Sequence, residues 1–131
     1  MSPVERDAAY LWDMLDAART IQKFATGVSF EEFLRDRKLQ LAIERCVEII
    51  GEASRRISDD FKTDHPGIPW GRILAQRNVL AHEYDEIKQE RMWLVVTVHV
   101  PALVPQLEMV LPPHPMRNKP VLEKRYLEFI S

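Results

Sequence analysis

The sequence predicts an all-α domain, a four- to five-helix antiparallel bundle. Apolar residues recur at spacings of three and four along four stretches, as expected for helices that each bury one face. Only four glycines occur in 131 residues, which disfavours a β fold rich in hairpins. The length suits one domain, and a hydrophobic fraction of 46% is sufficient for a buried core.

The first predicted helix has one apolar stripe, formed by Leu11, Met14, Leu15, Ala18, Ile21 and Phe24. Gly27 closes this helix. Ser29 can cap a short second helix, because a serine side chain accepts hydrogen bonds from the free N–H groups of a first turn. Glu31 and Glu32 follow in that turn, where negative charge is favourable. A long helix followed by a short one is therefore expected.

The next long segment also has a single stripe, formed by Leu39, Ala42, Ile43, Cys46, Ile50, Ala53 and Ile57. Cys46 is the only cysteine, so no intrachain disulfide can form, and its place in the stripe predicts inert packing. The segment KTDHPGIPWG (62–71) is predicted to be a loop, because Pro66, Gly67 and Pro69 interrupt helices. Pro69 and Trp70 then open the next long helix.

The last long segment, QERMWLVVTVHVPALVPQLEMVL (89–111), fits two structures. Its β-branched run WLVVTVHV (93–100) suits a strand, whereas a three/four alternation favours a helix, which we predict. The alternating seam is formed by Trp93, Val96, Val100, Leu103, Leu107 and Val110. Pro101 and Pro105 are expected to kink or split this helix. The seam suits either the bundle core, which we favour, or a dimer interface anchored by Trp93.

Residues 1–111 are thus predicted to form one helical domain, and the Pro-rich residues 112–131 an extended C-terminal tail. The net charge of -2 argues against bulk electrostatic attraction to nucleic acid, so any RNA contact would be local. No signal peptide and no apolar run of ~18 residues is evident, so we expect a cytoplasmic protein without a membrane span. The histidines lack ligand spacing, so neither metal nor cofactor is predicted.

The segment RNVLAHEY (77–84) carries four functional groups within eight positions: Arg77, Asn78, His82 and Tyr84. Asn78 and His82 are four residues apart and share one helix face, about 100° from Arg77 on a regular helix. Taken singly, a histidine near a helix C-terminus can simply favour the helix dipole, and a tyrosine is commonly a packing residue. The combination is what requires an explanation.

Arg77 falls inside the apolar stripe of its helix, which is formed by Trp70, Ile73, Leu74 and Ala81. A core-facing arginine is costly unless it is paired. Arg77 therefore has two possible roles. In the structural role, its charged end either snorkels to solvent or pairs with an acid such as Glu52. In the other role, Arg77 faces a cleft that binds an anion.

The chemistry that fits the group is metal-independent cleavage of RNA. A histidine can take the proton of a ribose 2′-hydroxyl or give one to the leaving oxygen. An arginine can stabilise the charge that develops on phosphorus oxygens, and an asparagine can orient a phosphate or the imidazole. One histidine cannot be base and acid at once, so a second copy of the chain across a two-fold axis could supply the other role.

RNVLAHEY resembles the R-x-x-x-x-H-x-Y signature of the HepT-like toxins, in the HEPN superfamily. Arg77, His82 and Tyr84 match the signature, and Asn78 matches the polar position after the arginine. Surrounding segments are similar in the same order over about residues 5–111: IIGEASRRIS (49–58), HPGIPWGRI (65–73) and MWLVVTVHVPAL (92–103). The departure is LAQRN, where a small residue, often glycine, is expected near position 75 or 76. Gln76 adds bulk there.

The resemblance implies the toxin of a type VII-like toxin–antitoxin system, an endoribonuclease that forms homodimers with two motifs in a shared cleft. Arg77 and His82 would be catalytic, with Asn78 supporting them. The implied partner is a minimal nucleotidyltransferase (MNT) antitoxin that neutralises the toxin by attaching AMP to Tyr84. The alternative is a non-catalytic helical partner or binding module of a nucleotidyltransferase. A helical dimer with a structural Arg77 and His82 is the third interpretation.

Overall fold

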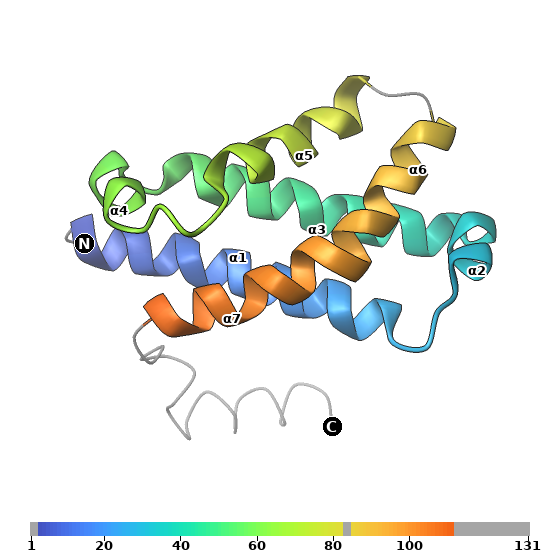
Figure 1. The fold of residues 1–131 in the computed structure, drawn as a ribbon, viewed down its shortest axis with the longest axis horizontal. Coiled ribbons are helices and arrows are strands. Elements are labelled where there is room, and N and C mark those ends of the chain that lie inside the picture. Colours follow the sequence, from blue (N-terminus) through green and yellow to red (C-terminus); the bar gives the residue numbers. More distant parts are fainter. Residues whose placement is uncertain (1–2, 83–84, 112–131) are drawn as a thin grey trace, which may run out of the picture.

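A computed structural model describes residues 3–82 and 85–111 of the chain. Every element within these residues is helical, which confirms the all-α fold class (Figure 1). In chain order the elements are α1 (Pro3–Ala25), α2 (Phe30–Arg35), α3 (Arg37–Arg56), α4 (Asp59–Asp64), α5 (Trp70–His82), α6 (Asp85–Leu94), the π-helical turn η1 (Val95–His99) and α7 (Val100–Val110). The predicted tail, residues 112–131, lies outside the described residues.

The short helix α2 forms where predicted, because a glycine in the preceding turn and a capping box at its N-terminus fix its start. Gly27 adopts a φ of 74°, a conformation that costs glycine little. The Ser29 hydroxyl accepts a hydrogen bond from the Glu32 N–H at 3.1 Å, and the Glu32 carboxylate accepts one from the Ser29 N–H at 3.3 Å. This reciprocal capping box ends the connection from α1 and begins α2.

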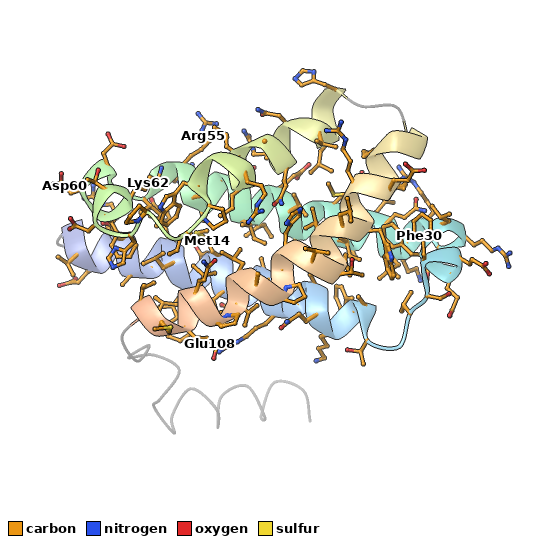
Figure 2. The ribbon with its side chains drawn as sticks, viewed as in Figure 1. Met14, Phe30, Arg55, Asp60, Lys62 and Glu108 are labelled. Carbon is orange, nitrogen blue, oxygen red and sulfur yellow. The ribbon has the colours of Figure 1, made fainter. Side chains whose placement is uncertain are left out.

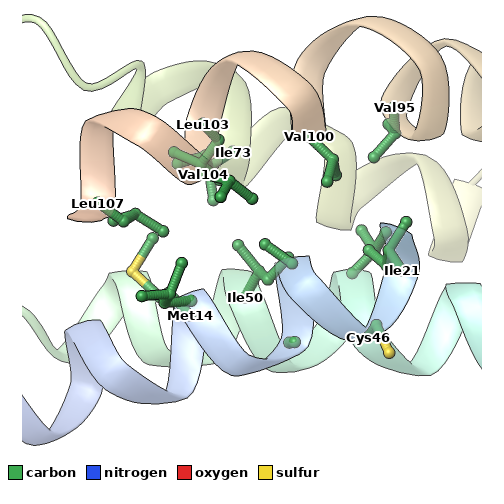
Figure 3. Packing of buried hydrophobic residues seen from close by; sticks show 14 of the residues in the cluster. Met14, Ile21, Cys46, Ile50, Ile73, Val95, Val100, Leu103, Val104 and Leu107 are labelled. Atoms are coloured by element: carbon green, nitrogen blue, oxygen red, sulfur yellow. The ribbon is translucent and has the colours of Figure 1, made fainter. Parts of the chain in front are cut away.

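The core lies where α1, α3 and the α6–α7 run pack together, and α5 packs on α3 (Figure 3). The predicted stripes of α1 and α3 are mostly buried, with one clear exception. Phe24 is 44% exposed, and Phe33 of α2 is the fully buried phenylalanine instead. Cys46 is buried as predicted, and burial raises the pKa of its thiol, which keeps it protonated and inert.

Helix α5 buries only part of its predicted stripe. Ile73 is buried against the core, whereas Leu74 is 40% exposed. Because α3 covers one side of α5 only, the face that carries Leu74 stays open. The exposed side of α5 is therefore wider than the sequence pattern indicates.

The seam of the last helical run serves the core of the same chain. Val96, Val100, Leu103 and Leu107 are buried. Trp93 packs on the rings of Phe30 and Phe33, with centroids 5.8 and 5.2 Å away, and so joins α6 to α2 (Figure 2 shows Phe30 beside α6). The core interpretation of the seam is confirmed, and the seam offers no argument for a dimer.

The last run is not split at Pro101 or Pro105. The backbone stays helical from Asp85 to Val110, with the π turn η1 placed just before Pro101. The Val100 N–H donates to the carbonyl of Val95, five residues back. A proline ring crowds the carbonyl four residues earlier and has no N–H to donate, and the wider π turn accommodates both defects.

The same run, Lys88–Val110, is 23 residues long, with a mean hydropathy of 1.4 in its most apolar window. By length and composition alone it is comparable to a membrane span. A third of that window is buried inside the protein, and α7 packs along α1. The core that it forms therefore accounts for part of its apolar character, while Leu94, Val98 and Met109 stay exposed.

Helix α4 was not predicted, because residues 62–64 were assigned to a loop. Ser58 caps this helix by accepting from the Phe61 N–H at 3.2 Å. The Ser58 N–H and hydroxyl also donate to the Asp7 carboxylate at 2.9 and 2.6 Å, which ties α4 to α1. The signal was present in the sequence, since Ser58 is followed by Asp59 and Asp60 in the first turn.

A buried ion pair fixes α6 to α3. The Lys88 ammonium lies 2.8 Å from the Glu44 carboxylate, and the two side chains are only 15% and 11% exposed. Arg37 makes a longer contact with the other carboxylate oxygen, at 3.6 Å. Breaking a buried pair leaves an uncompensated charge in a poorly solvated place, so its loss is expensive.

Glu44→Gln should lower the free energy of unfolding by about 3 kcal/mol, because the substitution removes the charge that pairs with Lys88 at 2.8 Å in a poorly solvated place. Urea denaturation of the two proteins measures the difference. The matched control is Glu108→Gln, which breaks the exposed Arg19–Glu108 pair at 3.6 Å and should cost less than about 1 kcal/mol. Equal losses in the two variants would show that the Glu44–Lys88 pair is as well solvated as a surface pair.

Candidate active site

The predicted site residues line one open groove of about 430 Å³ between α3 and the end of α5. The groove is lined by Glu48, Glu52, Arg77, Asn78, Leu80 and His82. On a regular helix, Arg77 is rotated by about 100° from the face that carries Asn78 and His82. The groove is nevertheless broad enough for all three side chains to line it. Tyr84, the predicted modification site, lies outside the described residues.

Arg77 reaches the groove by passing across a glycine of the neighbouring helix. Gly51 is buried in α3, and a Cβ placed on it would lie 2.7 Å from Cδ and 2.9 Å from Cβ of Arg77. Real side chains do not approach so closely, so only glycine fits at this point. Gly51 therefore acts as a notch that lets the arginine stem lie against α3.

The sequence analysis assigned no role to Gly51, although a signal was available. An isolated glycine inside a helical pattern costs about 1 kcal/mol relative to alanine, so it commonly has a packing or functional reason. Gly51 sits inside the stripe of the second long helix. What the sequence lacked was the pairing of Gly51 with Arg77, which are 26 residues apart along the chain.

The ion pair with Glu52, one of the alternatives left open for Arg77, does not form: among the described residues, no carboxylate oxygen lies within 4 Å of the Arg77 guanidinium. Glu48 is paired instead with Arg45, at 3.1 Å on the surface of α3. Half-buried Arg77 thus keeps its five N–H donors available for an anion that enters the groove.

His82 and Asn78 form the exposed part of the site, one helical turn apart at the end of α5. Within the described part of the chain, no hydrogen bond fixes the His82 ring, so it can turn toward a ligand. The two side chains are therefore placed where a ligand from solvent can meet them.

The groove of one chain is electrostatically mixed. Arg77 contributes a fixed positive charge, and Glu48 and Glu52 contribute carboxylates from α3. Such a groove directs a phosphate toward Arg77 and away from the α3 side, which is orientation rather than bulk attraction. Among residues 3–82 and 85–111, no group of three or more His, Cys, Asp and Glu side chains gathers as a metal site would.

Comparison with known proteins gives the family. A family profile described as Ribonuclease HepT-like matches residues 14–110, which include the groove and all its lining residues. The chain belongs to the HepT-like family. This confirms the resemblance inferred from RNVLAHEY and its surroundings.

Several relatives of this HepT-like chain carry ribonuclease names. A Thermococcus cleftensis protein named as a probable ribonuclease HepT is 40% identical over 99 residues, 76% of this chain and 90% of that protein. A Methanocaldococcus jannaschii protein named as a candidate RNase is 35% identical over 102 residues, 78% of this chain and 94% of that protein. A candidate RNase of Caldanaerobacter subterraneus subsp. tengcongensis is 32% identical over 102 residues, 78% and 91% of the two chains. No solved structure matches.

Proposed function

We propose that this HepT-like protein is an endoribonuclease that cleaves RNA without a metal ion. The observation that carries the proposal is the single groove that gathers Arg77, Asn78 and His82. The ribonuclease names of its relatives support the same activity. An arginine, an amide and an imidazole are together sufficient to bind a phosphodiester and to move the protons of its cleavage.

In the proposed reaction, a ribose 2′-oxygen attacks the adjacent phosphorus. His82 accepts the 2′-hydroxyl proton as the P–O2′ bond forms, and Arg77 stabilises the negative charge that grows on the non-bridging oxygens. The P–O5′ bond breaks, and the leaving 5′-oxygen takes a proton from a general acid. The products are a 2′,3′-cyclic phosphate and a 5′-hydroxyl, and Asn78 holds the phosphate or the imidazole in place.

The proposed reaction also needs a general acid, which the described residues of one groove do not supply. Among the described residues that line the groove, His82 is the only histidine, and an imidazole that has just accepted a proton has to deliver it to a different oxygen. We propose that a second copy of the chain in a homodimer supplies the partner imidazole across a two-fold axis. A second Arg77 would also offset the carboxylates of Glu48 and Glu52.

The test is cleavage of single-stranded RNA by the purified full chain in EDTA. The expected result is turnover unaffected by the chelator, with fragments that end in 2′,3′-cyclic phosphate. Cleavage that stops in EDTA and returns with added Mg²⁺ would refute metal independence. No cleavage under any condition, from a folded protein, would refute the ribonuclease proposal itself.

We further propose that the protein is a cytoplasmic toxin neutralised by a minimal nucleotidyltransferase that adenylylates Tyr84. The support is the position of Tyr84 in the chain, two residues after His82. In this step the phenol oxygen attacks the α-phosphate of ATP, pyrophosphate leaves, and the phenol proton passes to a base of the transferase. The attached phosphodiester would carry bulk and negative charge and would compete with RNA for Arg77.

Tyr84→Phe should remain toxic when it is co-expressed with the nucleotidyltransferase, because the phenylalanine ring has no oxygen to accept AMP. Growth and the protein mass, which rises by one or more AMP units in the wild type, are the two measurements. Tyr10→Phe on α1 is the control and should be modified and neutralised like the wild type. A Tyr84→Phe protein that is still modified and neutralised would show that another residue accepts the nucleotide.

A non-catalytic binding module is the second candidate function, and the acidic wall of the groove favours it. Glu48 and Glu52 oppose a polyanion but would suit a basic segment of a nucleotidyltransferase. In that case the purified protein binds the transferase and cuts no RNA. Glu52→Gln would then weaken the complex, whereas in the ribonuclease proposal the same substitution strengthens RNA binding.

A further inference from the structure

A second cavity, of about 310 Å³, lies on the other flank of α5, between α5 and the α6–η1 run. None of its lining residues is shared with the groove that holds Arg77. Its polar side chains are Arg72 and Gln76 from α5, Arg91 from α6 and His99 from η1. Neither the proposed cleavage nor the modification of Tyr84 uses any of them.

The charge of this second cavity is one-sided. Two arginines and a histidine line it, and none of the described residues that line it carries a carboxylate. Burial, and then the charge of Arg72, lower the pKa of His99, which favours its neutral imidazole in the empty cavity. An anion placed between Arg72 and His99 would counter both effects and would meet several N–H donors.

The walls of the cavity are apolar. Met92 and Val95 are buried, Val79 is half-buried, and Leu94 is exposed at the rim. A ligand that combines a charged group with a flat apolar face would therefore satisfy both parts of the lining. A volume of about 310 Å³ is at the lower end of the range for small-ligand sites, about 300–1,000 Å³, and fits a single nucleotide better than a folded peptide.

Gln76 adds an amide to the lining of this cavity. Its half-buried side chain lies one helical turn from Arg72 along α5. An amide can donate to a phosphate oxygen or pair with a base edge. The π turn that carries His99 is also a backbone feature often found at functional sites.

We propose that this cavity binds a nucleotide, with its phosphate held by Arg72 and His99 and its base against the accessible apolar side chains of Val79 and Leu94. Two sources carry this chemistry: a nucleotide of the RNA strand outside the cleavage site, and a free mononucleotide. The first source rests on the proposed ribonuclease function. The second does not.

The experiment measures binding of two adenine probes, AMP and a single-stranded ten-adenosine RNA, to the full chain. All proteins carry His82→Ala so that the RNA stays intact. Arg72→Gln should weaken binding of one or both probes by about fivefold, as expected for an exposed charge-assisted contact. Arg72→Lys should restore part of the loss. Arg35→Gln on α2 removes the same charge away from this cavity and should change affinity less than twofold.

The outcomes separate the two sources from failure of the proposal. A loss confined to the RNA probe assigns the cavity to the RNA strand, and a loss confined to AMP assigns it to a free nucleotide. Equal effects of Arg72→Gln and Arg35→Gln, or no binding of either probe, overturn the proposal. So does an acidic peptide that binds through Arg72 while neither probe does. A wild type that cuts no RNA but binds AMP through Arg72 refutes the proposed function alone.

Discussion

Replacing His82 with alanine should lower the rate of RNA cleavage by about 10²- to 10⁴-fold, the range for the loss of a general acid or base. The side chain is exposed at the last residue of α5, so the fold should be unaffected. The measurement is the single-turnover rate in EDTA, together with a thermal melt. Added imidazole should restore part of the activity, because a small base can occupy the space left by the ring. A purely structural His82 would not respond to imidazole.

Arg77 provides the companion test at the same groove. Arg77→Ala should reduce cleavage by about 10²- to 10³-fold, because the charge that grows on the phosphate oxygens loses its donor. Arg77→Lys keeps the charge but not the paired N–H geometry, so we expect an intermediate rate. If both alanine variants cut RNA at the wild-type rate with the same products, the groove is not the catalytic site.

Gly51→Ala should reduce cleavage by about 100-fold although the substituted residue carries no chemistry. The new methyl group would lie 2.9 Å from Cβ of Arg77, which is fixed to the backbone of α5. A helical alanine is favoured over glycine by about 1 kcal/mol, but here α5 has to move away from α3 to make room. A displacement of the guanidinium by about 1 Å is sufficient for a loss of that size.

The matched control for this prediction is Gly71→Ala, because Gly71 is also helical but a Cβ there meets no atom within 4 Å. Gly71→Ala should keep full activity and equal or greater resistance to urea. Combining Gly51→Ala with Arg77→Ala removes the Cγ and Cδ contacts, so the double variant should regain part of the stability that Gly51→Ala loses. A fully active Gly51→Ala protein would show that the notch does not position Arg77.

The sequence predicted the fold class and the groove residues because both depend on local patterns. Periodicity identified the long helices, and RNVLAHEY brought Arg77, Asn78 and His82 together within six positions. The groove itself could not be predicted, since Glu48 and Glu52 belong to α3, and their place beside α5 depends on how the two helices cross. The same dependence on helix crossing left open whether Arg77 pairs with an acid such as Glu52 or faces an anion-binding cleft.

One local signal was missed because stronger loop signals follow it. Ser58 comes directly after Ile57, the last residue of the α3 stripe, and caps α4, whereas the prolines nearby favoured a loop. Pro101 and Pro105 predicted a kink or a break, whereas the π turn before them keeps the run helical. The π turn was not predicted from the hydrophobic periodicity. It adds only about one residue to an otherwise α-helical run, and a shift of that size is hard to tell from the ordinary scatter of apolar positions.

That added residue sets the rotational phase between the two halves of the last run. Each residue of an α-helix turns the chain by about 100°, so the π turn Val95–His99 offsets the face of α7 from that of α6. Met92, before the turn, and Leu107, after it, are both fully buried in the core. Removing one residue from the turn would rotate α7 by about 100° relative to α6, so that the buried faces of the two helices would no longer align. The length of this segment is therefore constrained more tightly than its composition, and homologous replacements there should preserve the residue count.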